Sequence, residues 1–307
     1  MDRTDWWEVS RRLPNTLPSF TYYRDRYAVM LLDWSIGPGV AVRELKRSRL
    51  GALLRKPPVR AAAARAPRGV LTPRTLAQIP CRSAERYRFA LGSWGAERWH
   101  RWHQTSRAGR NLVVHLCFPS SHDAIARRVL GAGAREEFAM SCHPRARSPL
   151  CTLAWSRIDI DWPTREALIE EVQSDWARDA RAWLDDMDRE LRDAGMHGES
   201  VERERYLRYV LRPHYALWPE ATLAASLELL VGTLGLRRIY YHTPASHLAL
   251  KQMEADWPPP RSLYTDLPRR FCFVETDRPP RFLYWDPSER VQRALATPGL
   301  RWHRLEL

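Results

Sequence analysis

The sequence predicts an α/β protein in which a mixed sheet is flanked by helices. In the second half of the chain, apolar runs of strand length alternate with amphipathic runs of helix length, which is typical of strands joined by helices. Hydrophobic residues make up 44% of the 307 residues, enough for a buried core. No apolar run approaches the roughly 18 residues of a membrane span, and the N-terminus lacks the pattern of a signal peptide. We therefore expect a cytoplasmic protein with no membrane partner.

Changes in composition divide the chain into three expected regions. Residues 1–86 form a basic N-terminal region, rich in aromatic residues and arginine, with a linker. Residues 87–288 form the α/β domain, which contains a helical insertion at 176–217. Residues 289–307 form a C-terminal tail.

The N-terminal region contains three recognisable segments. Tyr27–Asp33 is apolar and fits either a buried strand or a short helix. Residues 43–69 are basic, alanine-rich and interrupted by two prolines, which predicts a short basic helix followed by a flexible linker. Residues 71–79 predict a small helix capped by Thr72.

The sheet is expected to start after this region. Apolar and alternating segments predict strands at 87–91, 112–118, 138–142 and 150–159. A helix is expected over 120–130, closed by glycine. Residues 164–194 are ambiguous, because they fit one long helix or a strand over 167–172 followed by a helix after Asp175.

The clearest unit follows the insertion. A helix is predicted to begin at Trp218-Pro219-Glu220, with leucines along one face, and to end at Gly235. After it, the pattern predicts a strand at 238–242, a helix at 245–256, and strands at 271–275 and 282–285.

The charge distribution points to an anionic partner. The net charge is +13, and only three of the 49 basic residues are lysines. Arginine suits phosphate because its planar fork donates two parallel hydrogen bonds, although a genome rich in arginine codons would give the same bias. The excess is concentrated in residues 40–110, which favours nucleotide or nucleic acid.

Within that stretch, arginines alternate with tryptophans that can stack on bases, as in Arg98-Trp99-His100-Arg101-Trp102. The alternatives are a solvated basic surface and core tryptophans. The candidate nucleic-acid-binding residues are Arg43, Lys46, Arg47, Arg49, Arg55, Lys56, Arg98, Arg101 and Trp102.

The five cysteines are scattered and form no Cys-x-x-Cys pair, so buried reduced thiols are expected. Cys142-His143 with Cys151 lacks a fourth ligand at suitable spacing, and no metal site is predicted.

One motif resembles a known family. Ile169-Glu-Glu-Val-Gln-Ser-Asp-Trp176 is similar to a strand ending in GNAT-like domains of uncharacterised phage and mobile-element polyvalent proteins. Those domains continue with a Trp-Pro-Glu helix start, matched by Trp218–Glu220, and a Gly-plus-strand element, matched by Gly235 and 239–243. Tyr264–Pro268 matches a later element loosely. The resemblance covers residues 150–275 and implies a strand at 167–173, within a sheet of three antiparallel strands followed by a helix and a parallel strand.

The resemblance also implies acyl-CoA as a possible donor. GNAT enzymes hold its pyrophosphate at a glycine-rich helix start, where backbone N–H groups face the anion. The corresponding turn here is Leu217–Glu220, which has no glycine, while Pro219 removes a donor and Glu220 adds a negative charge. These residues argue against a standard CoA site and leave the cofactor open.

The candidate catalytic residues lie at the ends of two predicted strands, where α/β sheets place their sites. On an extended chain Glu171, Gln173 and Asp175 share one face and Glu170 points away. Glu171 or Asp175 fits a general base and His242 a general acid. The candidate substrate-binding residues are Gln173, Ser174, Tyr241 and Trp218. The alternative is that the carboxylates cap the next helix and pair with arginines.

Two functions from different classes follow. The first is a GNAT-like transferase that acts on tRNA or DNA. The second is a non-catalytic nucleic-acid-binding or assembly protein on a degenerate GNAT-like fold, whose basic N-terminal region carries the function. Whether the protein is an enzyme is left open.

Overall fold

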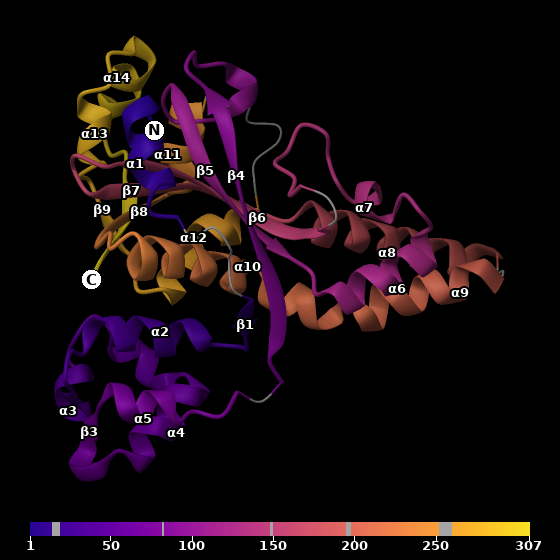
Figure 1. The fold of residues 1–307 in the computed structure, drawn as a ribbon, viewed down its shortest axis with the longest axis horizontal. Helices are drawn as coiled ribbons and strands as arrows, with labels where there is room; N and C mark the ends of the chain where they lie inside the picture. The colour runs from indigo at the N-terminus through magenta and orange to yellow at the C-terminus, as the bar shows by residue number, and fades with distance from the viewer. Residues whose placement is uncertain (14–18, 82, 148–149, 195–197, 252–259) are drawn as a thin grey trace.

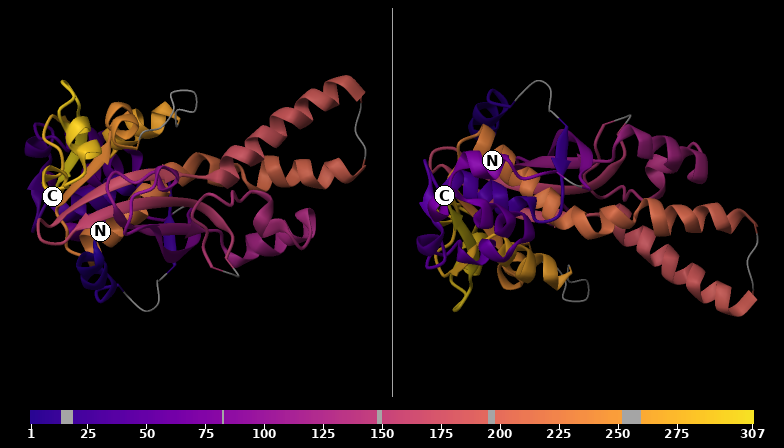
Figure 2. Two further views of the ribbon diagram at one scale, coloured as in Figure 1. Left: turned by 90° about the horizontal axis from the view of Figure 1, so that it is seen from above. Right: turned by 90° about the horizontal axis from the view of Figure 1, so that it is seen from below.

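The computed structural model describes residues 1–13, 19–81, 83–147, 150–194, 198–251 and 260–307. An eight-stranded mixed sheet crosses the centre of the molecule, with helices packed on it (Figure 1). A small helical body lies below the main body in Figure 1, and a pair of long helices extends away from the main body (Figure 2). The predicted α/β class is therefore confirmed.

The strand order in the sheet is β1-β4-β5-β6-β7-β8-β10-β9. All neighbouring strands are antiparallel except β7 and β8, which run in parallel. The strands of this sheet are β1 (Phe20–Tyr22), β4 (Glu85–Ala96), β5 (Gly109–Cys117), β6 (Thr152–Asp161), β7 (Glu166–Gln173), β8 (Arg238–His242), β9 (Val274–Thr276) and β10 (Trp302–Glu306). A separate two-stranded ladder pairs β2 (Val40–Ala41) with β3 (Val70–Leu71).

The helices connect these strands and cover the sheet. The α-helices are α1 (Arg3–Ser10), α2 (Arg26–Ser35), α3 (Val42–Leu45), α4 (Pro57–Arg65), α5 (Pro73–Ala77), α6 (Ser120–Leu130), α7 (Ala134–Glu137), α8 (Asp175–Ala194), α9 (Gly198–Arg205), α10 (Arg212–Leu227), α11 (Pro244–Lys251), α12 (Arg261–Arg270), α13 (Arg281–Tyr284) and α14 (Glu289–Leu295). Short 3₁₀ turns are η1 (Gly51–Arg55), η2 (Pro67–Gly69) and η3 (Arg101–His103), and π-helical turns are η4 (Tyr206–Val210) and η5 (Glu228–Thr233).

The ambiguous segment is a strand followed by a helix. Residues 166–173 form β7, and α8 begins immediately afterwards at Asp175. Ser174 makes the transition, because its Oγ accepts a hydrogen bond from the N–H of Ala177, 3.0 Å away, and satisfies one free donor of the first helical turn. The strand predicted for 167–172 and the helix predicted after Asp175 are confirmed.

The helix predicted to begin at Trp218 begins earlier. It starts at Arg212, directly after η4, so that Trp218, Pro219 and Glu220 all lie inside α10. Proline is common in the first turn of a helix and rare in its interior. Pro219 therefore suggested a helix start at Trp218, whereas it lies inside α10. The helix packs on the sheet, where Ser226 Oγ lies 2.6 Å from Ser156 Oγ of β6.

Three other predicted strands need correction. Residues 138–142 form turns rather than a strand, and 282–285 lie in and beside α13. Of 271–275, only the last two residues belong to β9, because the chain first turns at Cys272, whose φ is +59°. These short apolar runs contribute buried side chains from turns and helices, which periodicity cannot distinguish from a strand.

The C-terminal residues are not a tail. Strand β10 lies between β8 and β9 in the sheet, and Trp302 and Leu305 are buried. Its pairing with β8 runs from Trp302 opposite His242 to Glu306 opposite Arg238. The segment predicted as a tail therefore completes the sheet.

Residues 24–79 form a compact unit, which we call the helical subdomain. It consists of α2 to α5, η1, η2 and the β2–β3 ladder, and it is inserted between β1 and β4. The flexible linker predicted within 43–69 is wrong. Pro57 and Pro58 form the first turn of helix α4 instead of interrupting regular structure. Tyr27–Asp33 belongs to a helix, α2, and Thr72 caps α5 as predicted.

Three of the five cysteines are buried (Cys117, Cys151 and Cys272), Cys81 and Cys142 are exposed, and none of them forms a disulfide with another described residue. In the described part of the chain, no helix is both long and apolar enough to cross a membrane.

Candidate functional site

A bulge in β7 brings two carboxylates together near the end of the strand. β7 and β8 pair only from Glu166 to Ile169, opposite Arg238 to Tyr241. On the other side of β7 the register with β6 shifts, since Arg157 is opposite Glu171 but Ile158 is opposite Ile169. Glu170 is the extra residue, and a bulge changes the direction in which side chains point. The expectation that Glu170 points away from Glu171 is therefore wrong.

Both carboxylates lie beside one lysine. The Nζ of Lys251, at the end of α11, is 3.6 Å from Glu170 Oε2 and 3.7 Å from Glu171 Oε2. The same ammonium donates to the carbonyl oxygen of Glu170 at 2.8 Å. Glu170 and Lys251 are almost completely buried. We call Ser106, Arg157, Glu170, Glu171, His242 and Lys251 the charge cluster.

Glu170 is fully hydrogen-bonded within this cluster. The N–H of Ser106 donates to its Oε1 at 3.0 Å, and the Ser106 hydroxyl donates to its Oε2 at 2.8 Å. His242 Nε2 lies 2.9 Å from the same hydroxyl and 3.3 Å from Glu170 Oε2, while its Nδ1 lies 3.0 Å from Ser246 Oγ. This network assigns the ring proton of His242 to Nε2.

Glu171 pairs with an arginine on the neighbouring strand. The guanidinium of Arg157 donates to Glu171 Oε2 through Nη2 and to the carbonyl oxygen of His103 through Nη1. Both side chains are buried. The sequence-based alternative, in which a strand carboxylate pairs with an arginine, thus describes what Glu171 does in the structure.

Burial and pairing shift the pKa values of the cluster in opposite directions. Burial alone would raise the pKa of Glu170, but His242 and Lys251 hold it well below its ordinary value. Burial likewise opposes ionisation of Glu171, but Arg157 and Lys251 keep its pKa low. Burial lowers the pKa of Lys251 to about 8 and also lowers that of His242. At neutral pH the cluster therefore holds two carboxylates, two cations and a neutral imidazole.

Next to the cluster lie buried polar atoms without a hydrogen-bond partner among the described residues. They are the hydroxyls of Tyr241 and Tyr264, both ring nitrogens of His247, and Nε of Arg157. The rings of His247 and Tyr264 are 4.6 Å apart, and those of Tyr241 and Tyr264 are 5.7 Å apart. Native structures leave few buried polar groups unpaired, so a concentration of them marks a candidate ligand site.

Asp175 and Gln173 belong to a second, more open group. Asp175 Oδ1 accepts from Gln173 Nε2 at 2.9 Å and from Arg178 Nη2 at 3.2 Å, and lies 2.8 Å from His143 Nδ1. The ring of His143 lies 5.5 Å from that of Trp155 and keeps partial solvent contact. Asp175 therefore contacts Gln173, Arg178 and His143. Glu171 has different partners, Arg157 and Lys251.

The predicted site residues thus separate into three places. Glu171, His242 and Tyr241 lie in or beside the charge cluster, and Gln173 and Asp175 in the more open group. Ser174 caps α8 and donates to the carbonyl oxygen of Leu153 at 2.5 Å. Trp218 is half-buried inside α10, packed against the main core.

The sequence missed Ser106, Arg157, Lys251 and His143. Lys251 could have been recognised from the sequence, because it is one of only three lysines among 49 basic residues. A lysine is the cation whose protonation responds to burial, whereas arginine stays charged. The others lie far from the motif in sequence and are brought near it only by strand pairing and loops.

Residues 217–220, which correspond to the pyrophosphate-binding turn of GNAT enzymes, do not fit acyl-CoA. Residues 217–220 offer no free backbone N–H groups, because they lie inside α10 rather than at its start. The carboxylate of Glu220 is buried, where it accepts from the N–H of Asp25 at 3.0 Å and lies 4.0 Å from Arg270 Nη1. Among the described residues, no group of three His, Cys, Asp or Glu side chains is arranged to hold a metal ion.

Most of the predicted nucleic-acid-binding residues are on the helical subdomain. Arg43, Lys46, Arg47, Arg49 and Arg55 are exposed there. Lys56 is instead half-buried, with Nζ 3.1 Å from Asp25 Oδ1 and above the ring of Tyr27.

The aromatic stretch after β4 is divided between surface and core. Arg98 and Trp102 are exposed, and Arg101 lies in η3. The indole N–H of Trp99 donates to the carbonyl oxygen of Thr105 at 2.9 Å, and Arg290 lies 4.2 Å above its ring. Trp99 is therefore a structural residue.

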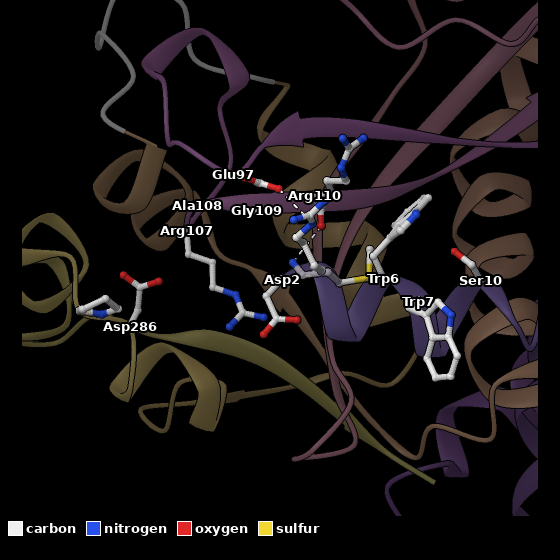
Figure 3. A pocket seen from close by; sticks show the side chains of 13 residues that line it. Asp2, Trp6, Trp7, Ser10, Glu97, Arg107, Ala108, Gly109, Arg110 and Asp286 are labelled. Atoms are coloured by element: carbon white, nitrogen blue, oxygen red, sulfur yellow. Dashed lines mark hydrogen bonds and ion pairs between the residues drawn. The ribbon is translucent and has the colours of Figure 1, made fainter.

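A cleft of about 770 Å³ opens elsewhere, between α1, the β4–β5 hairpin and the loop after α13 (Figure 3). Its walls include Trp6, Trp7, Arg107 and Arg110. Arg107 is held from within by Asp159, whose Oδ2 is 2.7 Å from Arg107 Nε. None of the residues predicted as site residues lines this cleft.

No protein-family model, curated protein or solved structure matches the chain.

Proposed function

We propose that the protein binds nucleic acid through its helical subdomain, and that its GNAT-like sheet serves as a scaffold. The observation that carries the proposal is the distribution of charge. Residues 24–79 contain twelve basic and three acidic residues, and so hold nine of the thirteen net positive charges in fewer than a fifth of the residues. A basic surface of this kind attracts a polyanion over distances of a Debye length and gains affinity from released counterions.

The subdomain contains little acid to neutralise this charge internally. Asp25 is already used by Lys56, and the exposed acids are Asp33 and Glu44. The exposed arginines therefore extend into solvent with an excess of positive charge, which favours DNA or tRNA as the partner.

Two features support a GNAT-like domain as the scaffold. Strands β4 to β7 are consecutive and antiparallel, and β8 then joins β7 in parallel after a helical crossover. The motif around Glu171 lies at the end of β7, as the resemblance implies. Against catalysis with acyl-CoA stand the position of residues 217–220 inside α10 and the pairing of Glu171 with Arg157.

The binding proposal can be tested by fluorescence anisotropy. Labelled duplex DNA and tRNA should bind the protein in low salt, and the logarithm of the affinity should fall linearly with that of the salt concentration. Replacing Arg43, Arg47 and Arg49 by glutamine should weaken binding and reduce the salt slope. The exposed Arg127 and Arg128 of α6, replaced in the same way, provide the control. If neither nucleic acid binds at low salt, the proposal fails.

A second function, catalysis beside the charge cluster, is favoured by the unpaired buried groups. Tyr241, Tyr264 and His247 lie beside the charge cluster, and the pKa of about 8 of its Lys251 suits proton transfer. Buried polar atoms without a hydrogen-bond partner are expected where a bound substrate would supply the hydrogen bonds.

Removing one unpaired hydroxyl separates this function from a structural role. Tyr241→Phe deletes an oxygen that has no hydrogen-bond partner among the described residues, so the variant should fold as stably as the parent or more so. If the cluster is catalytic, transfer of a group to tRNA or DNA incubated with the protein in a cell extract, detected by mass spectrometry as a gain in nucleotide mass, should be lost in this variant. Absence of transfer by the parent protein leaves binding as the function.

A further inference from the structure

Helix α4 exposes small and basic side chains along one side. Val59 and Ala62 are buried against the rest of the helical subdomain, whereas Arg60, Ala61 and Ala64 are exposed. Arg65, also exposed, continues the same side, and its Nε donates to the carbonyl oxygen of Ala61 at 3.2 Å. The outer surface of α4 therefore consists of Pro57, Ala61 and Ala64, with Arg60 and Arg65 on either side.

Helix α4 contains no acidic residue and follows η1 closely in the chain. No aspartate or glutamate occurs between Glu44 and Arg74. η1 ends at Arg55 and α4 begins at Pro57, so the two helices are joined by a single residue. In Figure 1, α2 lies between α4 and the sheet.

Small side chains allow the backbone of a helix to approach a surface closely. The major groove of B-DNA is about 12 Å wide and admits an α-helix, provided that its leading face is not too bulky. Alanine can contact the methyl group of thymine, while flanking arginines reach phosphates or guanine edges. The approach of a helix from a tight two-helix unit is one established way of reading duplex DNA.

We infer that α4 enters the major groove of duplex DNA, with Ala61 and Ala64 against the base edges and Arg60 and Arg65 on the groove walls. This inference rests on the proposed function and specifies its partner and binding element. The basic residues of α3 and of the turn after it, including Arg47 and Arg49, then lie on the same subdomain and contact the backbone beyond the groove.

A charge-neutral change tests the groove contact. Ala61→Gln/Ala64→Gln keeps every charge and retains helix-forming residues, but it widens the leading face of α4. Measured by anisotropy with a labelled 20-base-pair duplex, the affinity should fall at least tenfold. Ala124→Gln/Ala182→Gln, at exposed alanines of α6 and α8, is the matched control and should bind like the parent.

A charge variant measures the flanking contacts. Arg60→Ala/Arg65→Ala should weaken duplex binding and lower the salt slope by about 2, since each phosphate contact contributes about 0.9. Circular dichroism should show that all variants keep the helical content of the parent.

The outcomes distinguish the inference from the proposed function. If the Ala61/Ala64 variant binds the duplex as well as the parent does, the arginines only touch the phosphate backbone and the inference is overturned, although nucleic-acid binding stands. Equal losses for single-stranded DNA or tRNA in that variant also overturn it, because neither presents a B-form major groove. If the parent binds no nucleic acid, both fail.

Discussion

Lys251 is the residue on which the buried charges beside β7 depend. Its ammonium lies within 4 Å of both Glu170 and Glu171, and it is almost completely buried. Removing one member of such a group leaves an uncompensated charge in a medium of low dielectric constant.

We predict that Lys251→Met lowers the free energy of unfolding by about 3–5 kcal/mol, because a buried carboxylate loses its counter-charge. Urea denaturation followed by circular dichroism measures the change. Lys46→Met, at an exposed position, is the control and should alter stability by less than about 0.5 kcal/mol. A loss below about 1 kcal/mol for Lys251→Met would mean that the cluster does not depend on the ammonium.

Buried histidines make stability depend on pH. Burial lowers the pKa of His115 to about 4 and that of His214 to about 3, from an unfolded value near 6.5. Below pH 6.5 the unfolded chain therefore takes up protons that the folded protein refuses, and the stability falls as the pH falls.

The expected slope is about 1.4 kcal/mol per pH unit for each histidine between pH 6 and 4. Glu170, whose pKa is also depressed in the folded state, adds a loss in the same direction below about pH 4.5. Urea midpoints measured from pH 7 to 4 should show this decline. His115→Gln should make it shallower, and His100→Gln, at an exposed residue, should not. An unchanged slope in His115→Gln would contradict the assignment.

The residues of the strand motif were predictable, but their partners were not. Alternation along an extended chain correctly placed Glu171 and Gln173 on the face that meets Arg157 and Trp155, since these are their cross-strand neighbours. It failed at Glu170, because a bulge is a property of pairing between two strands. Ser106, Arg157 and Lys251 come from three other segments, which no local pattern connects to the motif.

Among the elements, β10 has the largest consequence for the boundaries of the fold. It was predicted as part of a tail, yet it lies between β8 and β9. Its alternation is short and interrupted by charged residues, so five residues near the chain end gave too weak a signal. Longer elements such as α6 and β5 were predicted well, because their own side chains carry a clear pattern. The strand at β7 was left open, because its residues fit a helix as well as a strand.

We expect Leu305→Ala to cost about 2–5 kcal/mol, because this side chain is completely buried in the main core. Arg304→Ala, at the adjacent and partly exposed position, should cost less than about 1 kcal/mol. Thermal denaturation compares the two variants. Equal, small effects would indicate that β10 is not an integral strand.

At the scale of the whole molecule, the helical subdomain packs against the elements behind the sheet. The rings of Tyr27 in α2 and Phe271 after α12 stack with centroids 4.3 Å apart, and both are completely buried. Glu220 of α10 accepts from the N–H of Asp25 in the same interface. Apolar stacking and a buried hydrogen bond thus join the two parts.

Phe271→Ala should therefore lower the free energy of unfolding by about 3–5 kcal/mol and uncouple the two parts. Differential scanning calorimetry should show one transition in the parent and a broadened or double transition in the variant. Tyr284→Ala, at an exposed aromatic residue of α13, should leave the profile unchanged. A single sharp transition in Phe271→Ala would show that the stack does not couple the parts.

The insertion of the helical subdomain between β1 and β4 has a mechanical consequence. Its incoming and outgoing chains are hydrogen-bonded to each other, with Phe20 opposite Tyr87 and Tyr22 opposite Glu85. An attachment through two paired strands resists twisting, whereas a single tether allows free rotation. A ligand bound to this subdomain would therefore be held in one orientation relative to the sheet, and a force on that ligand would pass through the β1–β4 pair.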